Sequence, residues 1–163
     1  MHELVIIFAK YVIVTPVLVL AFVFFRLSQR RKLELVAFLV LSVLVTALLA
    51  KLGAALHQDP RPFVRDGVIP YFAHGRDNGF PSDHTTYSAL IAFVVVRYSR
   101  WLGVSLAVVS LTIGMARVIA GVHHGQDIIG GFAIAAVGVS ASFLLILNAE
   151  SFYARRKRTK SVE

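Results

Sequence analysis

The sequence predicts an all-α fold: a polytopic membrane bundle of about five transmembrane helices, with a functional loop on its external face. Three observations support this prediction, namely the composition, the length of the apolar runs and the distribution of positive charge. Hydrophobic residues make up 57% of the 163 residues and charged residues only 16%, against about 45–50% and about 25% in an ordinary soluble domain. This composition excludes a disordered chain, a coiled coil and a typical soluble enzyme.

Five segments are predicted to span the membrane, because a membrane helix needs about 20 mostly apolar residues. They are Val5–Phe25, Leu33–Leu56, Ser82–Tyr98, Trp101–Ala120 and Ile128–Leu147, of which the third is the shortest. None of them shows a polar stripe at the helical period, which favours helices surrounded by lipid over amphipathic soluble helices. The first begins near Glu3 rather than at a basic cluster, so we expect a span there and not a signal peptide.

Positive charge is concentrated on one side of this topology. The chain has 17 Lys and Arg against 9 Asp and Glu, a net charge of +8. Most of the basic residues lie in three clusters: Arg26 and Arg30–Lys32, then Arg97 and Arg100, then Arg155–Arg158 with Lys160. A five-span chain puts all three clusters on the same face, and the positive-inside rule makes that face cytoplasmic. The chain is then a single domain, 1–163, that ends in a basic cytoplasmic tail at 154–163.

The basic excess could also indicate a nucleic-acid-binding protein. However, the basic residues follow the ends of the apolar segments rather than one face of a soluble helix. We therefore predict the lipid bilayer as the partner, and no nucleic acid. The two remaining links, His57–Pro81 and Gly121–Asp127, lie on the external face of the membrane in this topology. They carry most of the remaining ionisable residues. Ionisable groups at the membrane boundary are expensive, which makes each of them a functional candidate.

The first of these links presents an arginine beside a proline. Pro62 fixes the backbone direction and disfavours helix at Arg61. A guanidinium held in this way is a planar fork that suits a phosphate group. A solvated loop arginine paired with Asp59 or Asp66 would give the same sequence, so this feature alone does not decide.

A helix start follows at the end of the same link. Pro81-Ser82 before an apolar run is typical of a helix N-terminus with Ser82 as the N-cap. The free backbone N–H groups of such a terminus form an anion site, and His84 would lie in its first turn. Plain capping, with His84 on the surface, is the alternative interpretation.

The second link combines an arginine, two histidines and an aspartate. His123 and Asp127 are four residues apart, so one helical face carries both. A carboxylate that accepts from one imidazole nitrogen leaves the other nitrogen free and more basic, which is the His–Asp half of a catalytic triad. His124 could also reach Asp127, so spacing alone does not choose between the two histidines. A histidine-rich turn at the interface is the alternative, and the nearby Arg117 counts against it.

The same residues could in principle bind a metal ion, since the chain has 6 His. The sequence has no H-E-x-x-H or similar spacing, and Arg61 and Arg117 would repel a cation. It also has no Cys, which excludes disulfides, thiolate catalysis and Cys-ligated zinc. We therefore predict an anion site with no metal and no cofactor.

Together, the three stretches resemble the type 2 phosphatidic acid phosphatase superfamily, whose signature is K-x6-R-P, then P-S-G-H, then S-R-x5-H-x3-D. The matching residues are Arg61-Pro62, Pro81-Ser82-Asp83-His84 and Arg117-x5-His123-x3-Asp127. The local sequence around these motifs, with Pro60-Arg61-Pro62-Phe63 upstream of Phe80–Thr85, most resembles the bacterial undecaprenyl-diphosphate phosphatases of that superfamily.

Three positions depart from the signature. The motif lysine would fall at Ala54, and the nearest lysine is Lys51, one helical turn earlier. Asp83 stands where the family has Gly, and Ala116 where it has Ser. An acidic side chain at 83 should weaken phosphate binding unless it pairs with an arginine or a lysine, for example Arg61 or Arg76.

The resemblance implies an integral membrane phosphatase or diphosphatase that hydrolyses a polyprenyl diphosphate through a phosphohistidine. It implies His123 as the nucleophile, Asp127 as the group that fixes its tautomer, and His84 as general acid and then general base. The residues that hold the phosphate would be Arg61, Arg117, Ser82 and Lys51. The location would be a bacterial cytoplasmic (inner) membrane, with the site facing the periplasm or the cell exterior.

Other functions share these features. A phosphatase for phosphatidylglycerophosphate, phosphatidate or the lipid A 1-phosphate would carry the same motifs. Vanadium-dependent haloperoxidases share the anion site, but they are larger soluble proteins, which length and hydropathy disfavour here. A non-catalytic lipid-binding membrane protein is the alternative from another class, and the presence of His84, His123 and Asp127 argues against it.

Overall fold

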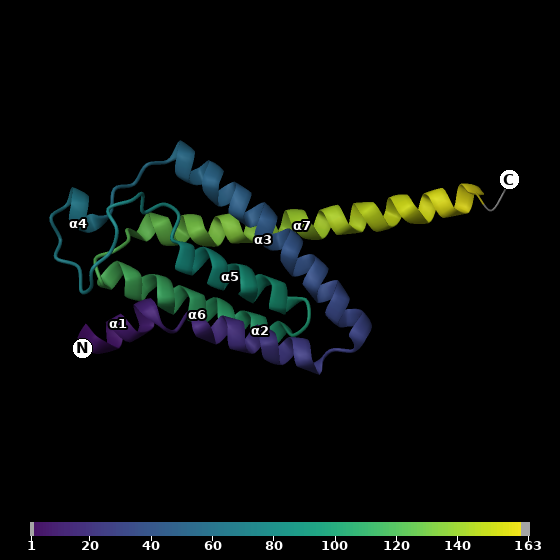
Figure 1. Ribbon diagram of the computed structural model, residues 1–163, viewed down its shortest axis with the longest axis horizontal. Coiled ribbons are helices and arrows are strands. Elements are labelled where there is room, and N and C mark those ends of the chain that lie inside the picture. The colour runs from purple at the N-terminus through teal and green to yellow at the C-terminus, as the bar shows by residue number, and fades with distance from the viewer. Residues whose placement is uncertain (1, 161–163) are drawn as a thin grey trace.

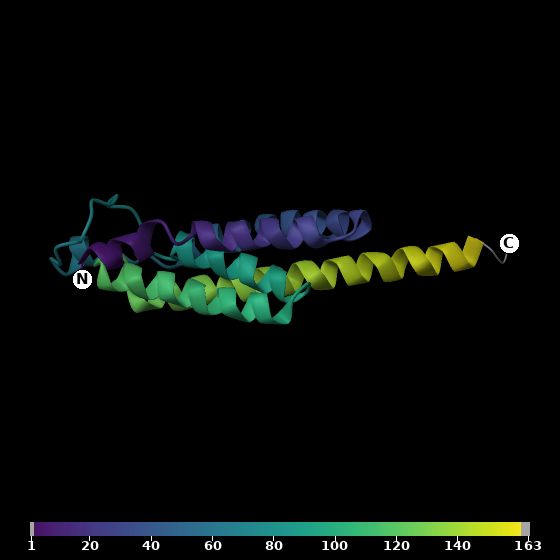
Figure 2. The ribbon, with the colours of Figure 1, turned by 90° about the horizontal axis from the view of Figure 1, so that it is seen from below.

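The computed structural model describes the backbone of residues 2–160 and the side chains of residues 2–151. Its helices are α1 (His2–Lys10), α2 (Val14–Arg26), α3 (Gln29–Leu56), α4 (Pro62–Arg65), α5 (Asp83–Val96), α6 (Arg100–Ile119) and α7 (Gly125–Lys160). The described residues form no strand apart from one isolated bridge between Pro60 and Asn78. The long helices lie in two layers, with α2 and α3 over α5, α6 and α7 (Figure 1; Figure 2). The all-α prediction is confirmed.

Three helices are long and apolar enough to cross a membrane: α3, α6 and the Gly125–Ser151 part of α7. A fourth span results if α1 and α2 count as one, although their axes bend by 44° at the break between them. Pro16 lies in the first turn of α2 and has no N–H to donate to the carbonyl of Val12, with which its ring would also clash in a continuous helix. The break at residues 11–13 lies at this position. The predicted first span is therefore a broken helix.

The predicted third span is the shortest helix of the main bundle. α5 has 14 residues, which corresponds to about 21 Å at the α-helical rise, against about 30 Å of hydrocarbon in a typical bilayer. The five-span count therefore stays a prediction. The structure assigns α5 a different task, because it supplies Ala89, Leu90 and Val94 to one core cluster and Ala92 and Val95 to another.

The two ends of the bundle differ in what they carry. The N-terminus, the loop 57–81 and the α6–α7 link lie at one end, whereas the α2–α3 and α5–α6 links lie at the other (Figure 1). The first two basic clusters of the sequence therefore share one end of the molecule, and α7 extends past that same end. The side chains of the predicted basic tail, 154–163, lie outside the described residues.

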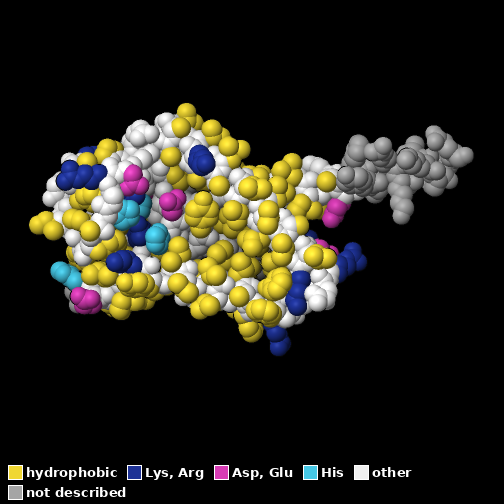
Figure 3. Space-filling model, in the orientation of Figure 1, with side chains coloured by type: hydrophobic (Ala, Val, Ile, Leu, Met, Phe, Trp, Pro, Cys, Tyr) yellow, Lys and Arg dark blue, Asp and Glu magenta, His cyan; other side chains and the backbone are white. Residues whose placement is uncertain are grey.

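Large apolar side chains cover most of the outer surface (Figure 3). Leu18, Phe25 and Trp101 are 63%, 75% and 83% exposed. An apolar belt of this extent would be an aggregation hazard in water, and it is the expected surface of a helix bundle in lipid.

The crossing of α3 and α7 depends on a glycine. A Cβ atom added at Gly138 of α7 would overlap the side chain of Thr46 on α3 and lie 3.0 Å from the Cα atom of Thr46. Small residues of this kind let membrane helices approach closely. Because α3 carries one wall of the functional cavity described below, this contact also sets the width of that cavity.

We expect Gly138→Ala to lower the thermal unfolding midpoint of the detergent-purified protein, because the added methyl group forces α3 and α7 apart. Overpacking of this kind typically costs about 1–3 kcal/mol. Gly125→Ala is the matched control in the same helix, because a Cβ atom there meets no other atom within 4 Å. Equal midpoints for the two variants would contradict the role assigned to Gly138.

Candidate active site

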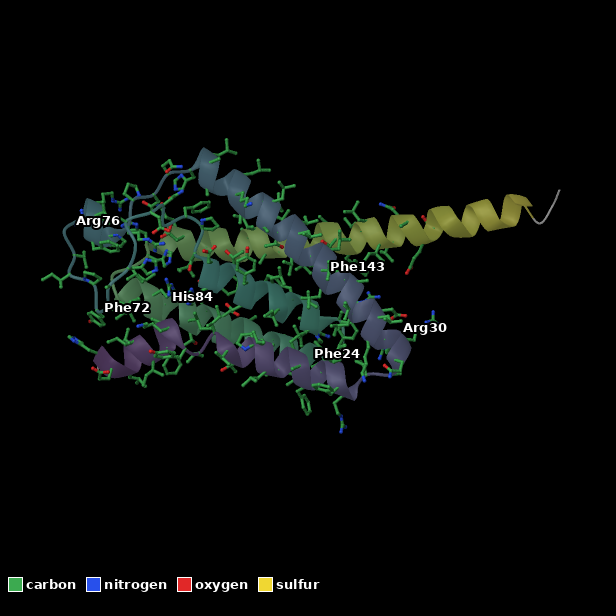
Figure 4. All side chains as sticks on the ribbon, in the orientation of Figure 1. Phe24, Arg30, Phe72, Arg76, His84 and Phe143 are labelled. Carbon is green, nitrogen blue, oxygen red and sulfur yellow. The ribbon has the colours of Figure 1, made fainter. Side chains whose placement is uncertain are left out.

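A cavity of about 540 Å³ opens at the end of the bundle formed by the loop 57–81 and the α6–α7 link. Its polar lining comes from Lys51, Arg61, His74, Asp77, Asn78, Asp83, His84, Tyr87, Arg117 and His123. Charged and histidine side chains gather at this end of the face shown in Figure 3, and a mainly apolar stretch separates them from the charged side chains at the opposite end. Figure 4 shows His84 on α5 among the nitrogen-bearing side chains at this end.

His123 lies in the α6–α7 link and is only 3% exposed. Its Nδ1 atom is 3.1 Å from Oδ2 of Asp127, and its Nε2 atom is 3.2 Å from Nη1 of Arg61. A guanidinium can only donate hydrogen bonds, so Nε2 accepts and the proton of the neutral ring is assigned to Nδ1. The predicted His123–Asp127 pair is therefore present, although His123 precedes α7 and the two residues do not share a helical face. The lone pair of Nε2 accepts from Arg61 at the wall of the cavity.

The neighbouring histidine does not compete for Asp127. The ring of His124 contacts the carboxylates of Asp59 and Asp66, with Nδ1–Oδ2 and Nε2–Oδ2 distances of 2.9 Å. Only the backbone N–H of His124 reaches Asp127, where it donates to Oδ2 at 2.9 Å. The structure thus chooses between two histidines that sequence spacing leaves equal.

Arg61 is buried beneath the loop that carries it. Its Nε atom donates to Oδ1 of Asp77 at 3.0 Å, and its Nη1 atom donates to the carbonyl of Val122 at 2.9 Å. The alternative pairing of Arg61 with Asp59 or Asp66 does not form. Those two carboxylates bind Arg65 instead, at 2.9 Å each.

Arg117, near the end of α6, is 3% exposed. Its Nη1 atom donates to the carbonyl of Ala9 in α1 at 2.9 Å, and its Nη2 atom lies 2.9 Å from Nε2 of His74. The sequence analysis missed His74, because no motif contains it and the loop 57–81 could bring any of its residues to the site. The sequence feature that could have identified His74 is its place in the same external loop as the Arg61-Pro62 motif.

Of the remaining predicted residues, two line the cavity and one is buried behind its wall. His84 and Lys51 line the cavity, from α5 and α3. Ser82 is at the N-cap position as predicted, but its side chain makes no capping hydrogen bond. It is fully buried, does not line the cavity, and accepts a hydrogen bond from the Thr85 hydroxyl at 3.2 Å.

Asp83 lines the same cavity and is exposed. Within the described part of the chain it has no ion pair within 4.0 Å, so the pairing with Arg61 or Arg76 that the sequence allowed does not form there. Arg61 binds Asp77 instead, one of the ionisable residues of the loop 57–81 that were functional candidates by their position alone.

An Asn-Gly pair fixes the loop against the helices. The Asn78 side chain accepts from the backbone N–H groups of Asp59 and Phe80 and donates to the carbonyls of Ala54 and His57. Gly79 follows, and a Cβ atom there would lie 3.0 Å from a carboxylate oxygen of Asp127. Asn-Gly is a turn signal in sequence, but its partners are set by the fold.

One cluster in the described residues has the composition of a metal site: Asp59, His124 and Asp127, whose ligand atoms lie within 4.8 Å of one another. The guanidinium of Arg65 already occupies its edge, with Nη1 2.9 Å from Asp59 and Nη2 2.8 Å from Nε2 of His124. A positive charge in contact with two of the three ligands opposes a cation there.

Burial and the neighbouring arginines favour the neutral forms of His123 and His74. Burial lowers the pKa of His123 below its ordinary value of 6.5, and the charges of Arg117 and Arg61 lower it further, against the hydrogen bond with Asp127. Burial also lowers the pKa of His74, again helped by Arg61 and Arg117. Hydrogen bonding to Arg61 lowers the pKa of Asp77, which stays ionised.

Two arginines around a buried His–Asp pair at the end of an apolar helix bundle are chemically suited to bind an anion. Comparison with known proteins agrees, since the profile of the PAP2 superfamily matches residues 31–151. The chain belongs to the PAP2 superfamily, as the resemblance in sequence implied.

Two relatives are informative about the class. The chain is 31% identical over 135 residues to undecaprenyl-diphosphatase BcrC of Bacillus subtilis, covering 78% of this chain and 66% of that protein. It is 31% identical over 140 residues to the putative undecaprenyl-diphosphatase YbjG of Escherichia coli, covering 85% and 70%. The chain thus spans slightly less than two thirds of the length of the first relative.

A solved structure shows the same fold. The crystal structure of Aquifex aeolicus LpxE superimposes with a TM-score of 0.64 at 25% identity, covering 86% of this chain and 81% of that one.

The pKa of His123, measured by NMR titration of labelled imidazole nitrogens in detergent, is expected below 6.5. Asp127→Asn is expected to lower it further, because the carboxylate stabilises the protonated ring and the neutral amide does not. The protonated form of His123 therefore becomes populated only at acidic pH, and in Asp127→Asn only at a still lower pH. A rise of the pKa in Asp127→Asn would contradict this account of the pair.

Proposed function

We propose that this protein is a membrane lipid phosphatase that hydrolyses undecaprenyl diphosphate, or a closely related polyprenyl diphosphate, by way of a phosphohistidine. The observation that carries the proposal is the placement of His123, with one ring nitrogen on Asp127 and the other on Arg61 at the wall of the cavity. A nucleophile oriented by a carboxylate beside fixed cationic donors suits phosphoryl transfer.

In the first step the phosphoryl oxygens accept the N–H of Arg61 that otherwise bonds to Nε2 of His123, which frees the lone pair of that nitrogen. Nε2 then attacks phosphorus, and the bond from phosphorus to the leaving oxygen breaks. Asp127 holds the Nδ1 proton and stabilises the positive charge that develops on the ring. His84 enters this step in its protonated form, which the negative charge of the bound diphosphate favours. It gives that proton to the leaving oxygen as general acid. In the second step His84 takes a proton from water, which attacks the phosphohistidine and releases inorganic phosphate while His123 returns to the neutral form.

Arg61 and Arg117 stabilise the negative charge on the phosphoryl group. Arg61 and Arg117 are held by backbone carbonyls and by neighbouring side chains, so their remaining N–H groups are oriented before the substrate arrives. Fixed donors need no reorganisation as charge spreads over the phosphoryl oxygens. Lys51 on the opposite wall adds a mobile positive charge, and Ser82 acts through the position of the α5 terminus.

The lipid part of the substrate fits the other wall of the cavity. Ala47, Ala50 and Ala54 of α3 face the site with small side chains and no charge. They leave apolar space beside the polar centre, in which the first isoprene units of a chain can lie while the diphosphate reaches the arginines. The two relatives at 31% identity carry the undecaprenyl-diphosphatase name, which supports this choice of lipid.

His123→Asn should abolish phosphate release from polyprenyl diphosphate while the protein still folds, because no nucleophile remains at the cavity wall. The expected loss of kcat is at least about 10³-fold, as for other enzymes deprived of their nucleophile. His124→Asn is the matched control, since its ring faces Asp59 and Asp66 instead of the cavity. Turnover of His123→Asn at the level of His124→Asn would remove His123 as nucleophile.

A substrate panel tests the choice of lipid. Purified protein is offered undecaprenyl and farnesyl diphosphate beside phosphatidylglycerophosphate, phosphatidate and lipid A 1-phosphate, with His123→Asn as the blank and EDTA present in a parallel series. We expect the highest kcat/KM for the polyprenyl diphosphates and no effect of EDTA. A higher value for another lipid would reassign the substrate, and metal-restorable inhibition would contradict a metal-free site. Phosphate release from none of the lipids would favour a non-catalytic lipid-binding protein.

A further inference from the structure

A second polar cavity lies at the opposite end of the bundle from the active site. It has a volume of about 250 Å³, and its lining includes Glu34 of α3, Arg97 at the end of α5, and Glu150 of α7. Arg97 follows His84 by thirteen residues of α5 and its C-cap, which is about 20 Å along the helix axis. The two cavities are therefore separate, and the proposed phosphatase chemistry uses none of these three residues.

Arg97 is held between two aromatic rings. Its guanidinium carbon lies 5.0 Å from the ring centroid of Phe143 on α7 and 6.0 Å from that of Phe38 on α3. Stacking on aromatic faces fixes a guanidinium and leaves the N–H groups at its edge free to donate. Figure 4 shows Phe143 at the crossing of α7 with α3, beside the apolar core.

The two carboxylates of the cavity stand apart from this arginine. Within the described side chains Arg97 has no carboxylate within 4.0 Å, although Glu34 and Glu150 line the same small space. Glu34 binds Arg30 on its outer side at 3.2 Å. Acidic side chains flank the notch below α7 in Figure 3. The cavity therefore holds one positive and two negative groups, with room for a ligand between them.

An apolar groove of about 400 Å³ continues from this cavity and shares Phe38, Arg97 and Phe143 with it. Its walls run between α5 and α7 along Phe93, Val139 and neighbouring apolar side chains, toward the middle of the bundle. A polar pocket that opens into an apolar groove matches a lipid, with the head in the pocket and an acyl chain in the groove.

We propose that this cavity is a binding site for phosphatidylethanolamine. The phosphate accepts from the edge of Arg97, and the ammonium group, two carbons further on, donates to Glu34 and Glu150. Phosphatidylglycerol has the phosphate but no cation, so only the neutral hydroxyl groups of its glycerol would meet the two carboxylates. Phosphatidylcholine has the cation, but its methyl groups leave no N–H to donate. The charge pattern selects the primary ammonium head among these three.

Native mass spectrometry of the detergent-purified full chain, titrated with palmitoyl-oleoyl phosphatidylethanolamine, phosphatidylcholine or phosphatidylglycerol, tests the proposal. The first phosphatidylethanolamine should bind about tenfold more tightly than the other two lipids, the effect of one charge-assisted hydrogen bond. Equal affinities, or a preference for phosphatidylglycerol, would overturn the proposal.

Two variants locate the site. Arg97→Gln should lower the affinity for all three lipids, because each of them carries the phosphate that Arg97 binds. Glu34→Gln with Glu150→Gln should lower the affinity for phosphatidylethanolamine to that for phosphatidylcholine. Arg100→Gln is the matched control, because Arg100 is exposed at the same end and lines neither cavity. An affinity for phosphatidylethanolamine that Arg97→Gln leaves unchanged, or that Arg100→Gln lowers equally, would overturn the assignment. A preference over phosphatidylcholine that survives Glu34→Gln with Glu150→Gln would also overturn it. The readout is lipid mass on the folded protein, so it is independent of whether the phosphatase proposal holds.

Discussion

The site is organised around a fully buried carboxylate, that of Asp127 at the start of α7. Burying such a group costs several kcal/mol unless hydrogen bonds replace its water. Its Oδ2 atom accepts from the His123 ring and from the backbone N–H of His124. Because Gly79 packs against the same oxygen, the loop 57–81, the α6–α7 link and the first turn of α7 are all fixed by one side chain.

The other side chains of the site are positioned by hydrogen bonds that lead away from Asp127. His123 turns its second nitrogen to Arg61, which is itself held by Asp77 and the carbonyl of Val122. Beyond the link, His124 joins Asp59 and Asp66, with Arg65 across them. Positive and negative groups alternate through this network, so a highly charged region is stabilised beside an apolar bundle, and the cavity keeps a net positive lining for an anion.

The two ends of α5 illustrate how a short helix can serve two surfaces. Its N-terminus carries His84 and Asp83 into the cavity, while its C-cap residue, Arg97, lies between Phe38 and Phe143 at the far end. Between the ends most side chains of the helix are buried against α2, α3, α6 and α7, and the remaining ones are largely half-buried. This burial explains why the sequence of α5 shows no polar stripe although the helix is too short for an ordinary span.

The sequence by itself determined the helical class, the common end of the first two basic clusters, and the residue types of the anion site. Those features depend on composition and on local spacing, as in His123 and Asp127 one helical turn apart. Only the tertiary structure decided that His123 and not His124 binds Asp127, that Asp77 and not Asp59 pairs with Arg61, and that His74 holds Arg117. These contacts join residues from separate elements, and packing sets their distances. For the same reason Ser82, a correct N-cap by sequence, lies under the cavity wall instead of in it.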